Sequence, residues 1–201
     1  MSSIRQRPMQ GRHHIIDTAL GPIGIAWSGR GITRLGLPEP DRSTLEGRMR
    51  RYGESAPPSA VPDGVAAALE LLRHYTNGER VDFGPVVLDL GGMTGIAERI
   101  YQAARRIGWG ETVTYGRLAR EVGSLQLSRA VGQAMARNPV PIIVPCHRVL
   151  ASGGKVGGFS GAGGTATKER LLALEGVALA PPAPLLDLMQ SGAAAGGHRN
   201  S

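Results

Sequence analysis

The stretch that decides the fold of the second half of this chain is YGRLAREVGSLQLSRAVGQAMARN, residues 115–138. Small and apolar residues recur at helical spacing on both sides of Gly123, which predicts two amphipathic helices separated by a short turn. Ala119 lies where two crossing helices need a small side chain. The pattern is typical of a helix-turn-helix, with a second helix from Ser128 to about Arg137. An ordinary helical hairpin shares this pattern, so the spacing alone leaves both open.

The second helix of this pair is expected to present polar side chains outward. The outward positions are Ser128, Arg129, Gln133 and Arg137. The smaller residues Ala130, Val131 and Ala134 would let the helix backbone approach another surface closely. Between residues 99 and 137 every basic residue is an arginine, at positions 99, 105, 106, 117, 120, 129 and 137. This positive segment favours nucleic acid as the partner surface.

The segment VPCHRV, residues 144–149, contains the only cysteine of the chain, Cys146. A lone cysteine is more often a packing residue than a nucleophile. Here His147 and Arg148 place a base and a cation beside the sulfur, and such neighbours lower the pKa of a thiol. The prolines at 139, 141 and 145 keep the approach to the cysteine out of a helix. These features favour a reactive thiol, with packing as the alternative.

A nucleophilic cysteine needs a base and a group that orients the base. Neighbouring side chains of an extended chain point to opposite sides, so a water is one route by which His147 reaches Cys146. Glu175 interrupts the apolar face of a predicted helix near its end, where a carboxylate is unfavourable unless paired. It is the candidate orienting group, although a solvated helix residue is equally compatible with the spacing. The glycine-rich segment 153–164 can bring backbone N–H groups close to a ligand.

Composition limits the class of protein. The chain has 201 residues, of which 41% are hydrophobic and 4% aromatic, enough for one aliphatic-cored domain or two small ones. The net charge of +7 favours a polyanionic partner. No apolar run approaches the ~20 residues of a membrane helix, and the N-terminus lacks the apolar stretch of a secretory signal. One cysteine excludes an internal disulfide and a thiolate-rich zinc site, so we expect a cytoplasmic protein.

The rest of the chain reads as an α+β arrangement. The segment 15–38 predicts short antiparallel strands joined by tight glycine turns. Further elements are predicted as follows: a short helix at 43–53, a helix at 64–78 that stops at Gly78, a strand at 81–92, a helix at 94–110 with Thr94 as its N-cap, and a helix at 167–176 with Thr167 as its cap. The C-terminal tail is rich in Pro, Ala and Gly and is typical of a flexible segment.

The strings NPVPIIVPCHRV, GGFSG and LLALEG, preceded by TYGRLA and SRAVGQAMARNP, resemble the O6-alkylguanine-DNA alkyltransferase family, also called methylated-DNA–protein-cysteine methyltransferases. The resemblance is strong over 94–177 and weaker over 13–90. It implies a small α/β (ribonuclease-H-like) domain at 13–90 and a mostly helical domain with a helix-turn-helix at 91–177. Outside these, the residues themselves predict a disordered N-terminus at 1–12 and a flexible tail at 178–201.

The resemblance also implies a function. A member of the family flips O6-alkylguanine, mainly O6-methylguanine, out of duplex DNA and transfers the alkyl group irreversibly to its own cysteine, once per molecule. It needs no cofactor or metal and no membrane. We therefore expect a monomer on the minor groove of double-stranded DNA, with cooperative binding to DNA left open.

The resemblance assigns roles by position. It makes Cys146 the alkyl acceptor, His147 the water-mediated base, Glu175 the carboxylate that orients the base, and Asn138 the residue that braces the turn before the cysteine segment. For the guanine, it implies a hydrogen bond from Tyr115, backbone carbonyls of Cys146 and Val149 for the amine, and the backbone N–H of Ser160 for O6. Phe159 stands where many members have tyrosine, so its ring is expected to form an apolar wall of the pocket.

For DNA, the resemblance makes Arg129 the side chain that fills the space left by the flipped base. Ser128, Ala130, Gln133 and Ala134 are expected on the same minor-groove face. Some relatives bind zinc through N-terminal cysteines and histidines. This chain is not expected to, and His13 and His14 are predicted to be surface residues. The segment SGAGGTATKERLLALEG, residues 160–176, is longer than in compact members. It borders the predicted alkyl pocket, so its length bears on the size of the alkyl group that the pocket accepts.

Three other functions compete. An alkyltransferase-like lesion-binding protein would lack the acceptor cysteine, which this chain has. A helix-turn-helix regulator with a packing or redox-sensing cysteine would need an effector domain, and no segment supplies one. A cysteine hydrolase normally has its histidine far away in sequence and would leave the basic helix pair unexplained.

Overall fold

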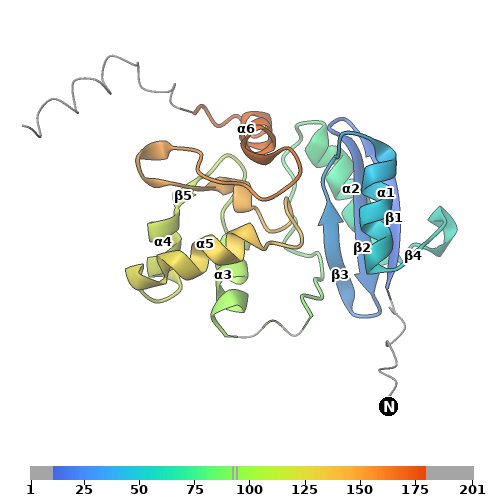
Figure 1. Cartoon of the computed structure of the whole chain (residues 1–201), viewed down its shortest axis with the longest axis horizontal. Helices are drawn as coiled ribbons and strands as arrows, with labels where there is room; N and C mark the ends of the chain where they lie inside the picture. Colours follow the sequence, from blue (N-terminus) through green and yellow to red (C-terminus); the bar gives the residue numbers. More distant parts are fainter. Residues whose placement is uncertain (1–10, 92, 94, 180–201) are drawn as a thin grey trace, which may run out of the picture.

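The first half of the chain forms a small twisted sheet in this computed structural model, which describes residues 11–91, 93 and 95–179 (Figure 1). Its strands are β1 (Arg12–Thr18), β2 (Gly21–Ser28), β3 (Gly31–Gly36) and the short β4 (Glu54–Ser55). The order across the sheet is β3-β2-β1-β4, with the first three antiparallel and β4 parallel to β1. Glycines at φ 114° (Gly21) and φ 148° (Gly31) begin β2 and β3, which confirms the tight glycine turns predicted for 15–38.

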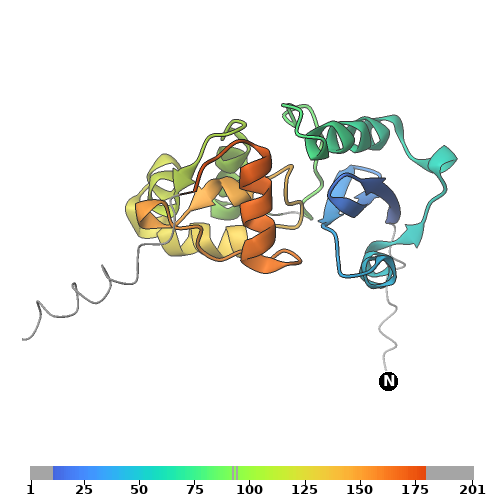
Figure 2. The ribbon, with the colours of Figure 1, turned by 90° about the horizontal axis from the view of Figure 1, so that it is seen from above.

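Two helices cover the two faces of this sheet, α1 (Arg42–Met49) and α2 (Asp63–Thr76). The central strand β2 is buried on both sides: Ile23 and Ile25 belong to the main core, whereas Ala26 packs with Leu45 and Met49 of α1. Figure 2 shows the sheet lying between α2 and α1. Helix α2 therefore packs on the face of the sheet that contributes to the main core.

The second half is mostly helical. Its helices are α3 (Ile96–Arg105), α4 (Tyr115–Glu121), α5 (Ser128–Ala136) and α6 (Gly164–Leu174), and a two-stranded parallel sheet joins β5 (Val113–Thr114) to β6 (Val149–Leu150). Short 3-10 turns lie at η1 (Arg50–Tyr52), η2 (Pro58–Ala60), η3 (Leu125–Leu127), η4 (Cys146–Arg148) and η5 (Ser152–Gly154). The observed α4 and α5 confirm the two helices predicted on either side of Gly123, and the mixed α+β class is confirmed.

One continuous cluster of buried apolar side chains joins the two halves. Their backbones also meet, because Leu35 N on strand β3 donates to Pro139 O, at 2.9 Å, in the segment before Cys146. Figure 1 shows β3 as the strand nearest the helical half. The N-terminal sheet therefore supports the segment that leads into the predicted active site.

The predicted strand at 81–92 is wrong. In the described part of this segment only an isolated bridge forms, between Leu88 and Ile32, with Ile32 N donating to Val87 O. Pro85 lacks a backbone donor and Gly84 is fixed by Asp82, whose Oδ1 accepts from Gly84 N at 2.7 Å. Phe83 and Val86 are buried in the core, whereas Val87 is exposed, and the described segment forms an irregular connection instead.

Both predicted helix caps are corrected. The N-cap of α3 is Gly95, and Thr94 lies outside the described residues. The N-cap of α6 is Gly163, so Thr167 lies within the helix, where its Oγ1 donates to Ala162 O at 2.7 Å. The glycines at 163 and 164 have positive φ and start the helix earlier than the side-chain signal suggested.

The N-terminal boundary and His13 also differ from expectation. Arg12 already belongs to β1, while 1–10 lie outside the described residues, as do 180–201 of the predicted tail. His13 is buried at 3% exposure and its Nδ1 bonds to Gly53 O at 3.0 Å, because β1 is an inner strand between β2 and β4. His14 is half-buried.

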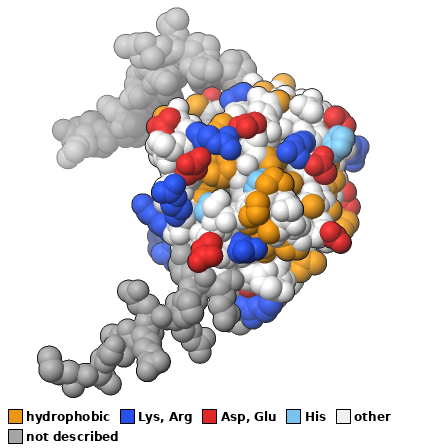
Figure 3. Space-filling model, turned by 90° about the vertical axis from the view of Figure 1, so that its right-hand side faces the viewer, with side chains coloured by type: hydrophobic (Ala, Val, Ile, Leu, Met, Phe, Trp, Pro, Cys, Tyr) orange, Lys and Arg blue, Asp and Glu red, His pale blue; other side chains and the backbone are white. Residues whose placement is uncertain are grey.

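The face on the sheet side carries charges of both signs dispersed among hydrophobic side chains (Figure 3). In the N-terminal half, Arg42 pairs with Asp17 and Arg48 pairs with Glu39. In the described residues, no helix combines the length and apolarity that crossing a bilayer requires.

Candidate active site and recognition helix

A tight loop after α5 places the cysteine. Asn138 spans this loop: its Nδ2 donates to Val144 O at 2.7 Å and its Oδ1 accepts from Val140 N at 3.1 Å. Val144 N closes the turn on Val140 O at 2.9 Å, and Ile142 takes a left-handed φ of 72°. A β-branched residue tolerates that conformation only when its surroundings impose it. Asn138 therefore lies where the predicted brace should be.

Cys146 begins the 3-10 turn η4 and is nearly buried, at 6% exposure. Burial raises the pKa of its thiol, while a hydrogen bond with the Asn138 side chain and the charge of Lys168 oppose that rise. The expectation that the side chains of His147 and Arg148, as neighbours of the sulfur, lower the pKa of the thiol needs correction, since both side chains are engaged with Glu175. The resting form is therefore a thiol that needs a base.

Glu175 is the centre of a buried hydrogen-bond network. Its Oε1 accepts from His147 Nε2 at 2.7 Å, and Arg148 binds both oxygens, with Nε to Oε2 at 2.8 Å and Nη2 to Oε1 at 2.9 Å. Gly110 N adds a contact to Oε2 at 3.3 Å. Burial acts to raise the pKa of Glu175, but the bonds from His147 and Arg148 together outweigh it and lower the pKa to about 2. The carboxylate is therefore charged, and it lies where the sequence placed an orienting group.

The hydrogen bond to Glu175 determines which ring nitrogen of His147 is free. Because Nε2 donates to the carboxylate, the neutral ring keeps its lone pair on Nδ1. Nδ1 is buried and has no hydrogen-bond partner among the described residues. Burial lowers the pKa of His147, and the bond and charge of Glu175 oppose that fall. His147, which follows Cys146 directly in the sequence, is therefore a neutral imidazole whose Nδ1 is free to act as a base.

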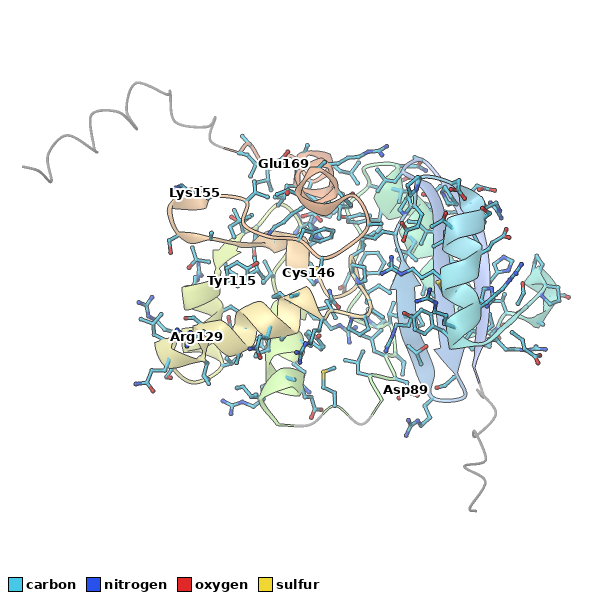
Figure 4. All side chains as sticks on the ribbon, in the orientation of Figure 1. Asp89, Tyr115, Arg129, Cys146, Lys155 and Glu169 are labelled. Atoms are coloured by element: carbon cyan, nitrogen blue, oxygen red, sulfur yellow. The ribbon has the colours of Figure 1, made fainter. Side chains whose placement is uncertain are left out.

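Two cavities border Cys146. One, of about 300 Å³, is lined by Tyr115, Gly132, Met135, Ala136, Cys146, Gly158, Phe159 and Ser160. The other, of about 340 Å³, opens between the helical half and strand β3 and shares Ala136, Cys146, Phe159 and Ser160 with the first. Figure 4 shows Tyr115 and Cys146 on neighbouring elements, α4 and the turn after α5. The predicted pocket residues Tyr115, Phe159 and Ser160 are thus brought together at the sulfur.

Val149 is the predicted pocket residue that lies deepest. It is fully buried and is not among the residues that line either cavity, and its carbonyl accepts from Lys168 Nζ at 2.6 Å. The carbonyl of Cys146 accepts from Val149 N within the turn. Each carbonyl keeps one further lone pair, which is what a contact with a guanine amine would require.

The outer face of α5 matches the predicted recognition face except at Ala134. Arg129 and Gln133 are exposed, and Ser128 and Ala130 are half-buried. Ala134 is 9% exposed, because it packs in the stripe that α5 turns toward α3, and its carbonyl accepts from Tyr101 Oη at 2.8 Å. The prediction that Ala134 faces DNA is therefore wrong. Arg129 lies at the start of α5 and Cys146 beyond its end (Figure 4).

Comparison with known proteins now decides the family. The DNA-binding domain of 6-O-methylguanine DNA methyltransferase matches residues 95–177. A methylated-DNA–protein-cysteine methyltransferase of Methanothermobacter thermautotrophicus is 36% identical over 167 residues, which cover 83% of this chain and 84% of that protein. This chain belongs to the methylated-DNA–protein-cysteine methyltransferase family. The predicted family and enzyme class are confirmed.

Solved members of the methyltransferase family share the fold. The O6-methylguanine methyltransferase of Mycobacterium tuberculosis superposes with a TM-score of 0.67 at 35% identity, covering 89% of this chain and 99% of that one. A structure of the Mycobacterium tuberculosis protein OGT in complex with DNA gives a TM-score of 0.65 at 34% identity, over 82% and 92% of the two chains. A relative that matches most of this chain is therefore known in complex with DNA.

Two buried polar residues of this methyltransferase were missed by sequence reasoning. Lys168 is fully buried, its Nζ lies 5.8 Å from the centre of the Tyr115 ring, and burial lowers its pKa to about 8. Its helical spacing with Leu171, Leu172 and Glu175 could have revealed it, since all four share one face of the last helix. Tyr75 was missed because it continues the apolar stripe of α2 and reads as core. Among the described residues, no group of three or more His, Cys, Asp or Glu side chains could hold a metal ion.

Proposed function

We propose that this protein repairs O6-alkylguanine, mainly O6-methylguanine, in double-stranded DNA by moving the alkyl group to its own Cys146. The observation that carries the proposal is the nearly buried cysteine at the base of a cavity, beside a buried His147–Glu175 pair. The sulfur forms a bond to the alkyl carbon as the bond from that carbon to guanine O6 breaks. Guanine leaves with the electron pair of that bond and takes up one proton, which balances the proton lost by the thiol. Because the thioether that forms on Cys146 is a stable bond, the proposal is that each molecule acts once.

The thiol must lose its proton before it attacks. His147 Nδ1 is the proposed acceptor, directly or through one water, because it is a basic nitrogen whose lone pair is unused by the described residues. Glu175 orients the ring and stabilises the imidazolium that forms. Lys168 adds a positive charge that favours the thiolate. Tyr115 is the proposed hydrogen-bond partner of the guanine, with Phe159 as an apolar wall and the Ser160 N–H near O6.

The DNA must deliver the base into the cavity, because the sulfur lies below the surface. Enzymes that act on a base in a duplex take it out of the stack. We propose that α4 and α5 act as a helix-turn-helix on the minor groove, with Ser128, Ala130 and Gln133 at the DNA surface. Arg129 fills the space that the base leaves. The exposure of Arg129 and Gln133 on one helix supports this assignment.

We further propose the division into a ribonuclease-H-like domain at 13–90 and a DNA-binding domain at 91–177. The strand order β3-β2-β1-β4, with β4 parallel to β1, supports the first of these. We also propose that the protein is a cytoplasmic monomer that uses no cofactor. A single cysteine that must stay reduced for the transfer supports the cytoplasmic location.

The test is to mix the protein with a duplex that contains one O6-methylguanine and to weigh the intact protein. A gain of one methyl group on Cys146, which stops at one equivalent, is expected. Cys146→Ser should bind the same duplex and gain no mass, and an unmodified duplex should leave the wild-type protein unchanged. Tight binding without transfer by the wild-type protein would refute the proposal and identify a lesion-binding protein instead.

A further inference from the structure

Tyr75 connects the N-terminal half to the reactive network. It lies on α2 and is completely buried, and its hydroxyl donates to Glu175 Oε1 at 2.7 Å. The same hydroxyl oxygen lies 3.3 Å from His147 Nε2. The Tyr75 hydroxyl therefore contacts both members of the pair, across 72 and 100 residues of sequence.

Packing alone does not require this hydroxyl. The Tyr75 ring is held by Phe83, with ring centroids 5.8 Å apart, and by Trp109 at 5.3 Å, contacts that a phenylalanine would also make. A buried hydroxyl costs free energy unless it is hydrogen-bonded. This one is directed at the carboxylate oxygen that also accepts from His147 and Arg148. The position of the hydroxyl indicates a role in arranging that oxygen.

We propose that Tyr75 is a positioning residue for alkyl transfer: its hydroxyl fixes Glu175 Oε1 and so holds His147 with Nε2 toward the carboxylate and Nδ1 available to Cys146. The inference rests on the proposed function of the site. It makes the N-terminal half part of the reactive centre, and it assigns to Tyr75 no contact with the alkyl group or with guanine.

The hydroxyl also controls how strongly Glu175 attracts a proton to His147. The groups that act on His147 are Glu175, which favours the imidazolium, Arg148 and Lys168, which oppose it, the neighbouring Cys146, and Tyr75. By donating to Oε1, Tyr75 takes up part of the negative charge that faces the ring. Without this bond Oε1 attracts the Nε2 proton more strongly, so the pKa of His147 rises and the ring is protonated at higher pH.

The experiment measures the single-turnover rate of methyl transfer against pH for the wild-type protein and Tyr75→Phe. Tyr75→Phe is expected to slow transfer about tenfold at neutral pH, the loss typical of one charge-assisted hydrogen bond. The acid limb of its pH profile should also move to higher pH. Tyr101→Phe is the matched control: it removes a buried hydroxyl whose hydrogen bond goes to Ala134 O and to neither His147 nor Glu175. Its pH midpoint should equal that of the wild-type protein.

A second readout does not depend on transfer. Nitrogen-15 NMR of the His147 ring in the unreacted protein should show the Nε2–H form in the wild type and a higher pKa in Tyr75→Phe. If Tyr75→Phe unfolds, replacement of Tyr75 by 3,5-difluorotyrosine keeps the ring and strengthens the donor, which should move the midpoint to lower pH. An unchanged midpoint and an unchanged His147 titration would overturn the proposal. A wild-type protein that transfers no methyl group would refute the proposed function, whereas the NMR titration would still test the role of Tyr75.

Discussion

At the scale of single residues, the reactive centre depends on a charge that burial alone would not permit. Glu175 stays ionised because Arg148 binds it in a bidentate manner and His147 donates to it. Arg148 in turn is only 6% exposed, and its Nη1 donates to Ile107 O at 2.5 Å. A buried ion pair of this kind adds little net stability over an apolar pair, but loss of one partner leaves the other charge uncompensated.

Glu175→Gln should therefore destabilise the protein by about 3 kcal/mol, because the buried Arg148 loses its counter-charge. Urea unfolding at neutral pH measures this change. Glu169→Gln, an exposed substitution on the same helix, is the control and should change stability by less than about 0.5 kcal/mol. Equal effects for the two variants would contradict the buried network.

The pH dependence of stability follows from the same group. The pKa of Glu175 is lowered from 4.5 to about 2, so its contribution of about 3 kcal/mol is present above pH ~5 and is lost as pH falls toward 2. Urea midpoints measured from pH 6 to pH 2 should fall steeply for the wild-type protein. Glu175→Gln should show a shallower fall over this range, and parallel curves would contradict the assignment.

At the scale of elements, the turn between α4 and α5 sets how the recognition helix is presented. Gly123 has φ 151°, and a Cβ there would lie 3.3 Å from Leu127 Cδ1 and 3.4 Å from Arg99 Nη2. A side chain at this position is strained in addition to being crowded. The glycine predicted from the pattern is therefore required by backbone geometry as well as by space.

Gly123→Ala should lower the free energy of unfolding by at least about 1 kcal/mol and should weaken duplex binding. Thermal unfolding and a duplex-binding titration measure the two effects. Gly47→Ala is the control: Gly47 is an exposed residue of α1, and apart from its chain neighbours and the backbone of its own helix no described atom lies within 4 Å of an added Cβ. That change should stabilise the protein by up to about 1 kcal/mol.

Arg129 tests the proposed role of α5 in replacing the flipped base. Arg129→Ala should slow methyl transfer from a duplex at least tenfold and leave transfer from free O6-methylguanine within about twofold, because only the duplex has a stack to fill. Single-turnover rates on both substrates measure the ratio. Arg30→Ala, at an exposed arginine paired with Asp89 in the N-terminal half, should leave both rates unchanged. Equal losses on both substrates for Arg129→Ala would exclude the role.

At the scale of the whole molecule, the net charge of +7 and the arginines of residues 99–137 predict DNA binding that is mainly electrostatic. The logarithm of the binding constant for a lesion-free duplex should fall linearly with the logarithm of the salt concentration, by about 0.9 for each phosphate contact. Fluorescence anisotropy titrations between about 50 and about 200 mM salt give the slope. The rate of methyl transfer from free O6-methylguanine should stay nearly constant over this salt range. A duplex affinity that does not change with salt would contradict a phosphate-contacting surface.

The sequence anticipated those parts of the fold that depend on local pattern. The pair α4 and α5 followed from helical spacing around Gly123, and the sheet of the first half from glycine turns between short apolar runs. Predictions failed where non-local packing decides. Residues 81–91 are apolar enough for a strand but form an irregular connection. His13 was predicted at the surface but is buried, because β4 pairs with its strand.

The sequence by itself determined the chemistry available to this protein: one cysteine with a histidine beside it, a carboxylate at the end of the last helix, and an arginine-rich helix pair. Tertiary structure alone decided how these groups act on one another. Packing the last helix against the cysteine turn buries Glu175 between His147 and Arg148, and packing α2 against both adds the hydroxyl of Tyr75. The physical reason is that burial removes water from these polar groups, so their bonding and ionisation depend on neighbours that lie far away along the chain.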